Sequence, residues 1–145
     1  EYGDSDLLCY RADGPEALVE RQAEQWDPML DWAEATHGAR LAPRAGIMHA
    51  PQDGAALDRL AARVHEMDAF ELAAFHDLVS LTGSLVLGLA ATDPAQDPQH
   101  LWALSRLDES WQEEQWGVDE EAAEMAARKQ AAFHHAHRFY TLCKA

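Results

Sequence analysis

The chain has 145 residues, which suits one domain with a single core, and 48% of them are hydrophobic, so a disordered chain is disfavoured. It carries 11 basic and 26 acidic residues, which gives a formal net charge of −15. Such a surface repels phosphate backbones and anionic lipid heads, so we expect neither a nucleic acid nor a membrane as partner. A protein with basic patches fits better, although acidity also simply keeps a small domain in solution.

The cysteine content and the first residues bear on the origin of the chain. Cys9 and Cys143 are too few for a disulfide scaffold and show no metal-ligand spacing, which indicates a reducing compartment. The chain begins at Glu1, and no apolar signal segment follows. We therefore expect a fragment of a longer protein.

The first third of the chain predicts a small β element and one long helix. Residues 7–11 (LLCYR) have the character of a short strand. Asp-Gly-Pro at 13–15 is typical of a helix start, and apolar residues then recur at helical spacing until Gly38 predicts the end. Pro28 interrupts the pattern, so we expect a kink or a split there. The irregular stretch 39–48 is a candidate second strand that pairs with the first.

Two further helices are predicted in the middle of the chain. Asp53 begins the first of them. Asp68 followed by Glu71 forms a capping box, and the helix that starts there is expected to run to about Ala91. Its second half, 78–91, carries no charge but is shorter than the roughly twenty residues of a membrane span, so we expect a buried central helix.

Two helices complete the chain. Asp97, followed by proline, starts a helix that is expected to run to Trp116 and to end at Gly117. Asp119 is then placed to cap the last helix. The apolar stripe along that helix consists of Val118, Ala122, Met125, Ala126, Phe133, Ala136, Tyr140 and Cys143.

Together these elements predict a mainly α fold, a helical bundle of about five helices with a small β element near the N-terminus. The bundle forms a single domain over residues 1–145. Trp26, Trp32 and Trp102 lie at helical spacing within it. Because tryptophan is highly buried on average, we expect all three in the core.

The sequence holds no complete pattern for catalysis or metal binding. His-Glu at 65–66 begins a zinc-protease motif, but Ala69 stands where the second histidine is required. Glu-x-x-His occurs at 34–37, whereas a di-iron site needs two such pairs. The histidines within 134–137 lack a nearby cysteine or suitably spaced carboxylate, which is typical of an exposed polar face. We therefore expect no metal, no cofactor and no catalytic residue.

The densest functional signal is the segment 107–121, which holds seven acidic residues and two tryptophans. Glu109 and Glu113 are four residues apart and project from one helix face, where like charges cost an isolated helix roughly a few tenths of a kcal/mol. Trp111 continues the apolar stripe and is expected in the core, whereas Trp116 near the helix end is expected to be partly exposed. This face is either a solvated surface or a binding surface for another polypeptide.

Three blocks of sequence can be compared with known families. They are LLCYRA at 7–12 with Gln22 and WDP at 26–28, LTGS at 81–84, and LDExWQxxxWG at 107–117. In this order they resemble the ATP synthase assembly-chaperone family that binds the α subunit of the soluble catalytic sector. The resemblance implies a chaperone that prevents free α subunits from aggregating until they pair with β, with no enzymatic activity and no cofactor. It also implies that this is the C-terminal helical domain of a protein with a smaller β-rich domain ahead of it.

The resemblance also implies which residues bind the partner. A glutamate of the Leu-Asp-Glu stretch matters in the family, and Glu109 is the best match, with Asp108 and Glu113 as alternatives. Gln112 and Trp116 complete the predicted partner-binding set, and we expect Glu109 to be exposed. The expected protein is a monomer in a bacterial cytoplasm, or in the mitochondrial matrix of a eukaryote. Two other functions stay open: an acidic interaction module with another partner, and a hydrolase whose paired acids face a pocket.

Overall fold

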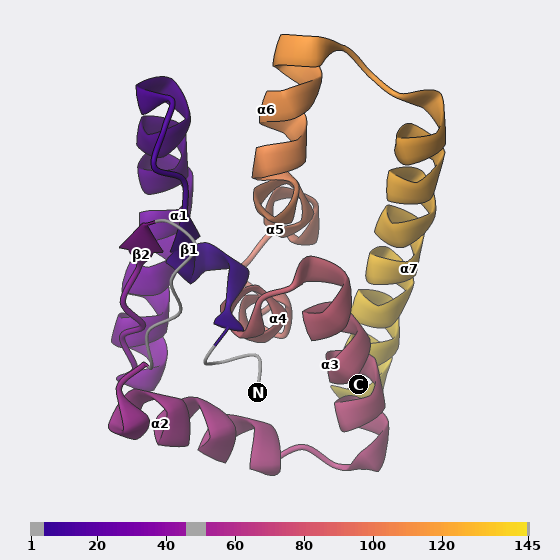
Figure 1. Cartoon of the computed structure of the whole chain (residues 1–145). Helices are drawn as coiled ribbons and strands as arrows, with labels where there is room; N and C mark the ends of the chain where they lie inside the picture. Colours follow the sequence, from indigo (N-terminus) through magenta and orange to yellow (C-terminus); the bar gives the residue numbers. More distant parts are fainter. Residues whose placement is uncertain (1–4, 46–51, 145) are drawn as a thin grey trace.

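The computed structural model describes residues 5–45 and 52–144 (Figure 1). Within these ranges the chain forms seven α-helices and one two-stranded sheet, which confirms the mainly α fold with a small β element. The helices are α1 (Glu16–His37), α2 (Gly54–His65), α3 (Ala69–Thr82), α4 (Leu85–Ala91), α5 (Pro98–Ser105), α6 (Leu107–Trp116) and α7 (Glu120–Lys144).

One predicted helix is divided into α3 and α4. Gly83 ends α3 in the left-handed conformation, with φ of 73° and its amide bonded to the Val79 carbonyl. The Ser84 side chain then caps α4 by accepting a hydrogen bond from the backbone N–H of Leu87 at 2.9 Å. The expected single helix was wrong because this Gly-Ser pair supplies both a stop and a new start.

A second predicted helix is divided into α5 and α6. Arg106 lies between them, and its amide bonds to the carbonyl of Ala103 at 3.1 Å, in the tighter 3₁₀ pattern. Neither glycine nor proline marks this break, so the residue pattern did not reveal it. These two divisions explain why there are seven helices in the described residues where about five were expected.

The opposite error occurs in α1. Pro28 lies inside α1, yet the helix continues from Glu16 to His37, so the predicted split is wrong. Gly38 ends α1 in the left-handed conformation with φ of 65°, as predicted. The cost of the missing proline N–H is accommodated within a helix whose neighbouring residues Met29 and Leu30 are buried in the core.

The predicted caps are confirmed. The side chains of Asp53, Asp97 and Asp119 each accept a backbone N–H from the first turn of the helix that follows, at 3.3, 3.0 and 3.2 Å. Asp68 and Glu71 form the full capping box, with bonds of 2.8 and 3.1 Å. Caps are local interactions, and this is why they can be predicted without knowledge of the tertiary fold.

The β element is smaller than predicted. Of the segment 7–11, Leu7–Cys9 forms a 3₁₀ turn and only Tyr10–Arg11 is a strand, β1. It pairs in parallel with β2 (Arg44–Ala45), so a second strand within 39–48 is confirmed. Residues 46–48 of that predicted segment lie outside the described residues.

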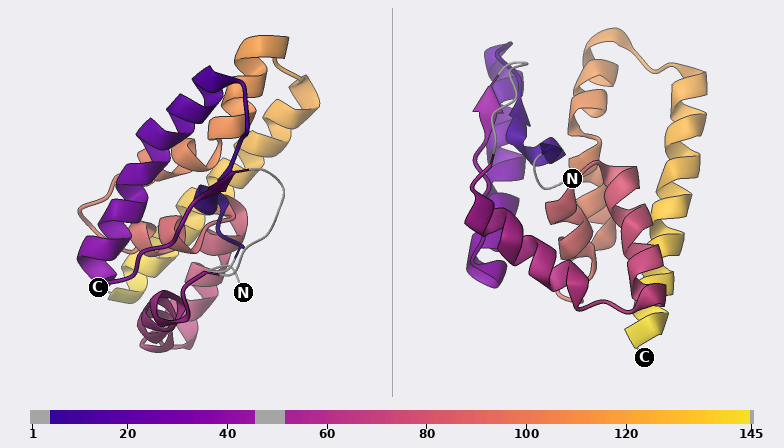
Figure 2. Two further views of the ribbon diagram at one scale, coloured as in Figure 1. Left: turned by 60° about the vertical axis from the view of Figure 1, so that its left-hand side comes forward. Right: turned by 60° about the horizontal axis from the view of Figure 1, so that its bottom comes forward.

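The core is built mainly from α1, α3, α4, α5 and the second half of α7. Figure 1 and the right view of Figure 2 show α1 and α7 on opposite sides, with α4 and α5 between them. Trp26 is fully buried and Trp102 is 5% exposed, as predicted, whereas Trp32 is only partly buried against the core. No helix in the described ranges is long and apolar enough to cross a membrane.

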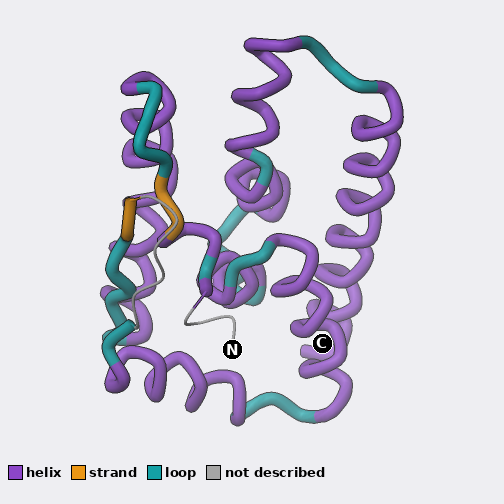
Figure 3. The backbone as a smooth tube through the Cα atoms, in the orientation of Figure 1, coloured by secondary structure: helices purple, strands orange, loops and turns teal. Residues whose placement is uncertain are grey.

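The first half of α7 does not join the core. Phe133, Ala136 and Tyr140 of its apolar stripe are buried, but Val118 and Met125 are 62% and 51% exposed. Figure 3 shows a loop joining the end of α6 to the start of α7 at the far edge of the molecule. The expected stripe is therefore wrong for its first part, where Val118 and Met125 are exposed to solvent.

Candidate partner-binding site

The helix that carries the acidic segment, α6, is fastened to α1 by an ion pair. The Arg21 guanidinium donates two hydrogen bonds to the carboxylate of Glu114, one of them 3.0 Å from Nη2 to Oε1. This bonding lowers the pKa of Glu114. The same guanidinium lies 5.0 Å from the ring centroid of Trp111. Trp111 is therefore half-buried beneath a cation, and its prediction as a core residue is wrong.

A buried amide makes the second connection between α1 and α6. Gln22 is 1% exposed, and its Nε2 donates to Asp108 Oδ1 at 2.8 Å. Its Oε1 accepts the backbone N–H of Ala12 at 2.9 Å. One side chain thus joins the segment after β1, helix α1 and helix α6, and it fixes the rotation of α6 about its axis.

The two parts of the first block, LLCYRA at 7–12 and WDP at 26–28, meet around Trp26. The Arg11 guanidinium lies 5.5 Å from the Trp26 ring centroid, pairs with Asp27 at 2.8 Å and donates from Nε to the Leu8 carbonyl at 2.7 Å. The Trp26 indole N–H donates to the carbonyl of Leu104 at 2.9 Å. These residues stabilise the fold, so the part of the family resemblance that they carry is explained by a structural role.

The LTGS block is joined to the N-terminal segment by a buried carboxylate. Asp6 is 1% exposed and accepts the backbone N–H groups of Leu8 and Val86 at 3.0 and 2.9 Å. Burial raises the pKa of Asp6, and these hydrogen bonds oppose that effect. The amide of Leu7 also donates to the carbonyl of Gly83 at 2.9 Å. The LTGS block therefore also has a structural role, since it joins the N-terminal segment to the helices.

The five predicted partner-binding residues all lie on α6, but they differ in exposure. Asp108 and Glu113 are half-buried, whereas Gln112 and Glu109 are exposed. Trp116 is the most exposed, at 86%. The exposure of Glu109 and Trp116 agrees with prediction. The partner-binding role of these five residues stays a prediction.

Glu109 remains largely available to a partner. Its carboxylate lies 3.9 Å from the guanidinium of Arg106, one turn earlier on the same chain, and its side chain is 48% exposed. Exposed pairs of this kind contribute at most about 1 kcal/mol, because solvent screens them. A charged group from another protein can therefore compete with Arg106 for Glu109.

The exposed tip of α6 and α7 includes residues that sequence reasoning missed. Val118 and Met125, with Trp116, are large apolar side chains that are more than half exposed. We call these three residues the apolar tip. The helical spacing of Val118 and Met125 indicated a core face, and nothing in the sequence shows that no neighbour covers it.

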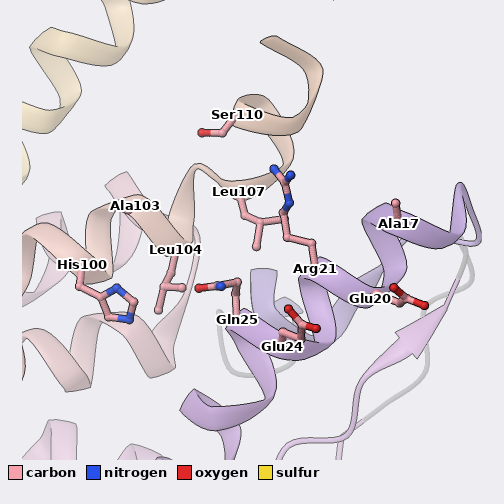
Figure 4. A pocket seen from close by; sticks show the side chains of 10 residues that line it. All are labelled: Ala17, Glu20, Arg21, Glu24, Gln25, His100, Ala103, Leu104, Leu107 and Ser110. Atoms are coloured by element: carbon pink, nitrogen blue, oxygen red, sulfur yellow. The ribbon is translucent and has the colours of Figure 1, made fainter. Parts of the chain in front are cut away.

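Two grooves open on either side of the contact between α1 and α6. The smaller, of about 280 Å³, is lined in part by Asp108, Trp111 and Gln112. The larger, of about 450 Å³, lies between α1 and the α5–α6 pair (Figure 4). Glu109 lines neither of these two grooves, so the paired acids Asp108 and Glu109 do not share one of them as the hydrolase alternative requires.

The histidines do not form a metal site in the part of the chain that the structure describes. No group of three or more histidine, cysteine, aspartate or glutamate residues there could hold a metal ion. His37, of the single Glu-x-x-His pair, packs edge-on against Trp32 with ring centroids 5.3 Å apart. Its burial lowers its pKa. His37 therefore belongs to the packing at the end of α1.

Known proteins share this fold along almost the whole chain. A family model described as ATP12 chaperone protein matches residues 1–34. The crystal structure of Atp12 from Paracoccus denitrificans superposes with a TM-score of 0.94 at 50% identity, covering 97% of this chain and 60% of that one. A point mutant of the same protein gives the same values. The Atu1473 protein of Agrobacterium tumefaciens gives a TM-score of 0.90 at 42% identity, covering 97% and 53%.

These relatives extend well beyond the region compared, since the chain spans about 60% of the Paracoccus protein. Over that region the agreement is close in both sequence and structure. The family model covers the N-terminal segment and most of α1, where Arg11, Gln22 and Trp26 hold the scaffold together. By these matches, the chain belongs to the ATP12 chaperone protein family.

Proposed function

We propose that this chain is a chaperone of ATP synthase assembly, which binds the free α subunit and prevents its aggregation until α pairs with β. The observation that carries the proposal is the exposed face of α6, where Glu109, Gln112 and Trp116 point away from the core. This face belongs to a fold shared with Atp12 of Paracoccus denitrificans. Because the chain spans about 60% of that protein, the proposal concerns the helical part of it.

The composition of this face suits a partner that must later leave. A net charge of −15 steers a basic partner toward the chain, which raises the association rate more than the final affinity. Trp116 offers a large apolar contact, of the type that dominates interface energies. The combination gives a moderate interface that β can displace.

We further propose that the chain acts as a monomer, without a cofactor, a metal or catalytic activity. A family described as a chaperone supports the lack of catalytic activity. The acidic surface disfavours nucleic-acid and membrane partners. We place the protein in a bacterial cytoplasm, or in the mitochondrial matrix if its source is a eukaryote.

The test measures light scattering by purified α subunits diluted out of denaturant, with and without the chain. We expect the wild-type chain to suppress scattering and Glu109→Lys to abolish this effect while its helical circular dichroism is unchanged. Asp58→Lys on α2, an exposed site outside the 107–121 segment with the same change of charge, is the control and should still suppress scattering. A collapsed helical signal for Glu109→Lys would show that this residue is structural, and equal loss in both variants would show that only net charge matters.

A pull-down separates this function from a general acidic interaction module. The tagged chain is incubated with an extract of a bacterium that has an F-type ATP synthase, and the bound proteins are identified by mass spectrometry. We expect the ATP synthase α subunit to dominate. A different dominant protein that is also lost with Glu109→Lys would contradict the proposed partner.

A further inference from the structure

The larger groove, between α1 and the α5–α6 pair, has no role in the function proposed above. On α1 it is lined by residues that recur three and four apart, so they form one stripe along the helix. In Figure 4 this stripe faces side chains of α5 and α6 across the groove. The stripe consists of Ala17, Glu20, Arg21, Glu24 and Gln25.

The opposite wall gives the groove an apolar floor. Leu104 and Leu107 are 3% and 5% exposed and lie at its base, while Ala103 is exposed and too small to fill it. The hydrogen bond from the Trp26 indole to the Leu104 carbonyl joins α1 to α5 beneath this floor. The groove thus has a volume of about 450 Å³, is open to solvent, and has Leu104 and Leu107 at its base.

The rim of the groove on α1 is acidic. Glu20 and Glu24 are exposed and one turn apart, and within the described residues neither forms an ion pair with this chain. Arg21 lies between them, but its guanidinium is bound by Glu114. That pair is neutral as a unit, so the two glutamates leave a local charge of about −2.

We propose that this groove binds lysine or arginine side chains of a basic amphipathic segment of a partner polypeptide. The alkyl part of such a side chain packs against the exposed Ala17 and Ala103, and its charged end reaches the carboxylates of Glu20 and Glu24. A purely apolar segment would leave both carboxylates unpaired, and an acidic one would be repelled. The inference rests on the proposed function only in taking the partner to be a polypeptide, and it adds a contact on α1 to the face on α6.

The test uses a fluorescently labelled helical peptide of leucines and lysines, with the lysines four residues apart, and measures its dissociation constant by anisotropy. We expect the double variant Glu20→Gln/Glu24→Gln to weaken binding about five- to tenfold, because two charge-assisted contacts are lost. The matched control is Asp58→Asn/Glu121→Gln, which removes the same charge from exposed sites on α2 and α7. It should change the dissociation constant less than about twofold.

A second variant tests the groove itself without changing any charge. Ala103→Phe fills it from an exposed position and should weaken binding to a similar extent, and Ala17→Phe on the opposite wall serves if the first variant fails to fold. Wild-type affinity in the folded phenylalanine variant, or equal weakening in both acid variants, would overturn the proposal in favour of diffuse attraction. Since no α subunit takes part, a failure here leaves the proposed chaperone function untouched.

Discussion

Gln22 shows how much one side chain can fix in this fold. It is buried, donates to Asp108 and accepts from Ala12, so it joins α1 to the segment after β1 and to the distant helix α6. Its polar character is unexpected at a buried position of an amphipathic helix, and sequence periodicity alone would suggest an apolar residue there. The bonds to α6 and to the segment after β1 explain it.

Replacement of Gln22 by methionine should therefore be costly. Gln22→Met keeps the volume but leaves the Ala12 N–H and the Asp108 carboxylate without their partner, so we expect a loss of about 2–3 kcal/mol in the free energy of unfolding. Urea denaturation followed by circular dichroism measures this. Gln25→Met, at an exposed position of the same helix, should change the stability by less than about 0.5 kcal/mol. Equal effects of the two variants would mean that the bonds of Gln22 contribute nothing.

At the scale of elements, the division between α3 and α4 brings these helices unusually close. A Cβ atom on Gly88 would lie 2.6 Å from Cγ2 of Val79, so no side chain fits without movement. We expect Gly88→Ala to destabilise the protein by about 1–3 kcal/mol, because the core around it is closely packed. Gly54→Ala is the control, since nothing lies within 4 Å of its new Cβ. Thermal unfolding that gives the same midpoint for both variants would refute the close approach.

The contact between the start of α3 and the end of α7 should make stability depend on pH. Lys144 Nζ lies 2.7 Å from Glu71 Oε2, and this pair lowers the pKa of Glu71 from its ordinary 4.5. A carboxylate with a lowered folded-state pKa stabilises the protein above its unfolded value, and this stabilisation is lost as pH falls through the folded value.

The charge of Glu71 can be removed while its capping role is kept. Glutamine also serves in a capping box, so Glu71→Gln should retain the cap. The free energy of unfolding of this variant should fall less than that of the wild type between neutral pH and about pH 3. Urea denaturation at both pH values measures the difference. Glu121→Gln, on an exposed turn of α7, should keep the wild-type dependence. If Glu71→Gln loses as much stability on acidification as the wild type, the ion pair does not act as described.

For the whole molecule, local chemistry was predictable and long-range packing was not. The caps at Asp53, Asp68 and Asp97 depend on a few adjacent residues and were predicted correctly. Arg106 separates α5 from α6 without a side-chain cap, so neither glycine, proline nor a capping residue marks this break in the sequence. The α6 face was predicted as a segment, because its acids are dense, but the partners of Asp108 and Glu114 come from α1.

The exposure of the apolar tip is the main feature that could not be predicted from the sequence. Val118 and Met125 have the spacing of core residues, and only the position of α7 relative to its neighbours decides that they face solvent. Exposed apolar clusters of this kind commonly mark interaction surfaces. Val118 follows Trp116 by two residues and Met125 lies on α7, so we propose the end of the molecule where α6 joins α7 as the region that a partner contacts.

The proposed chaperone function requires direct binding of the ATP synthase α subunit by the exposed end of α6. Calorimetric titration of purified α subunit with the wild-type chain, Trp116→Ala and Phe70→Ala measures this. Phe70 is 69% exposed at the start of α3, away from α6 (Figure 1), and is a matched loss of an exposed aromatic side chain. We predict that Trp116→Ala weakens binding at least about tenfold, in the range of an interface hot spot, and that Phe70→Ala binds as the wild type does. No binding by the wild-type chain, or equal weakening in both variants, would contradict the account.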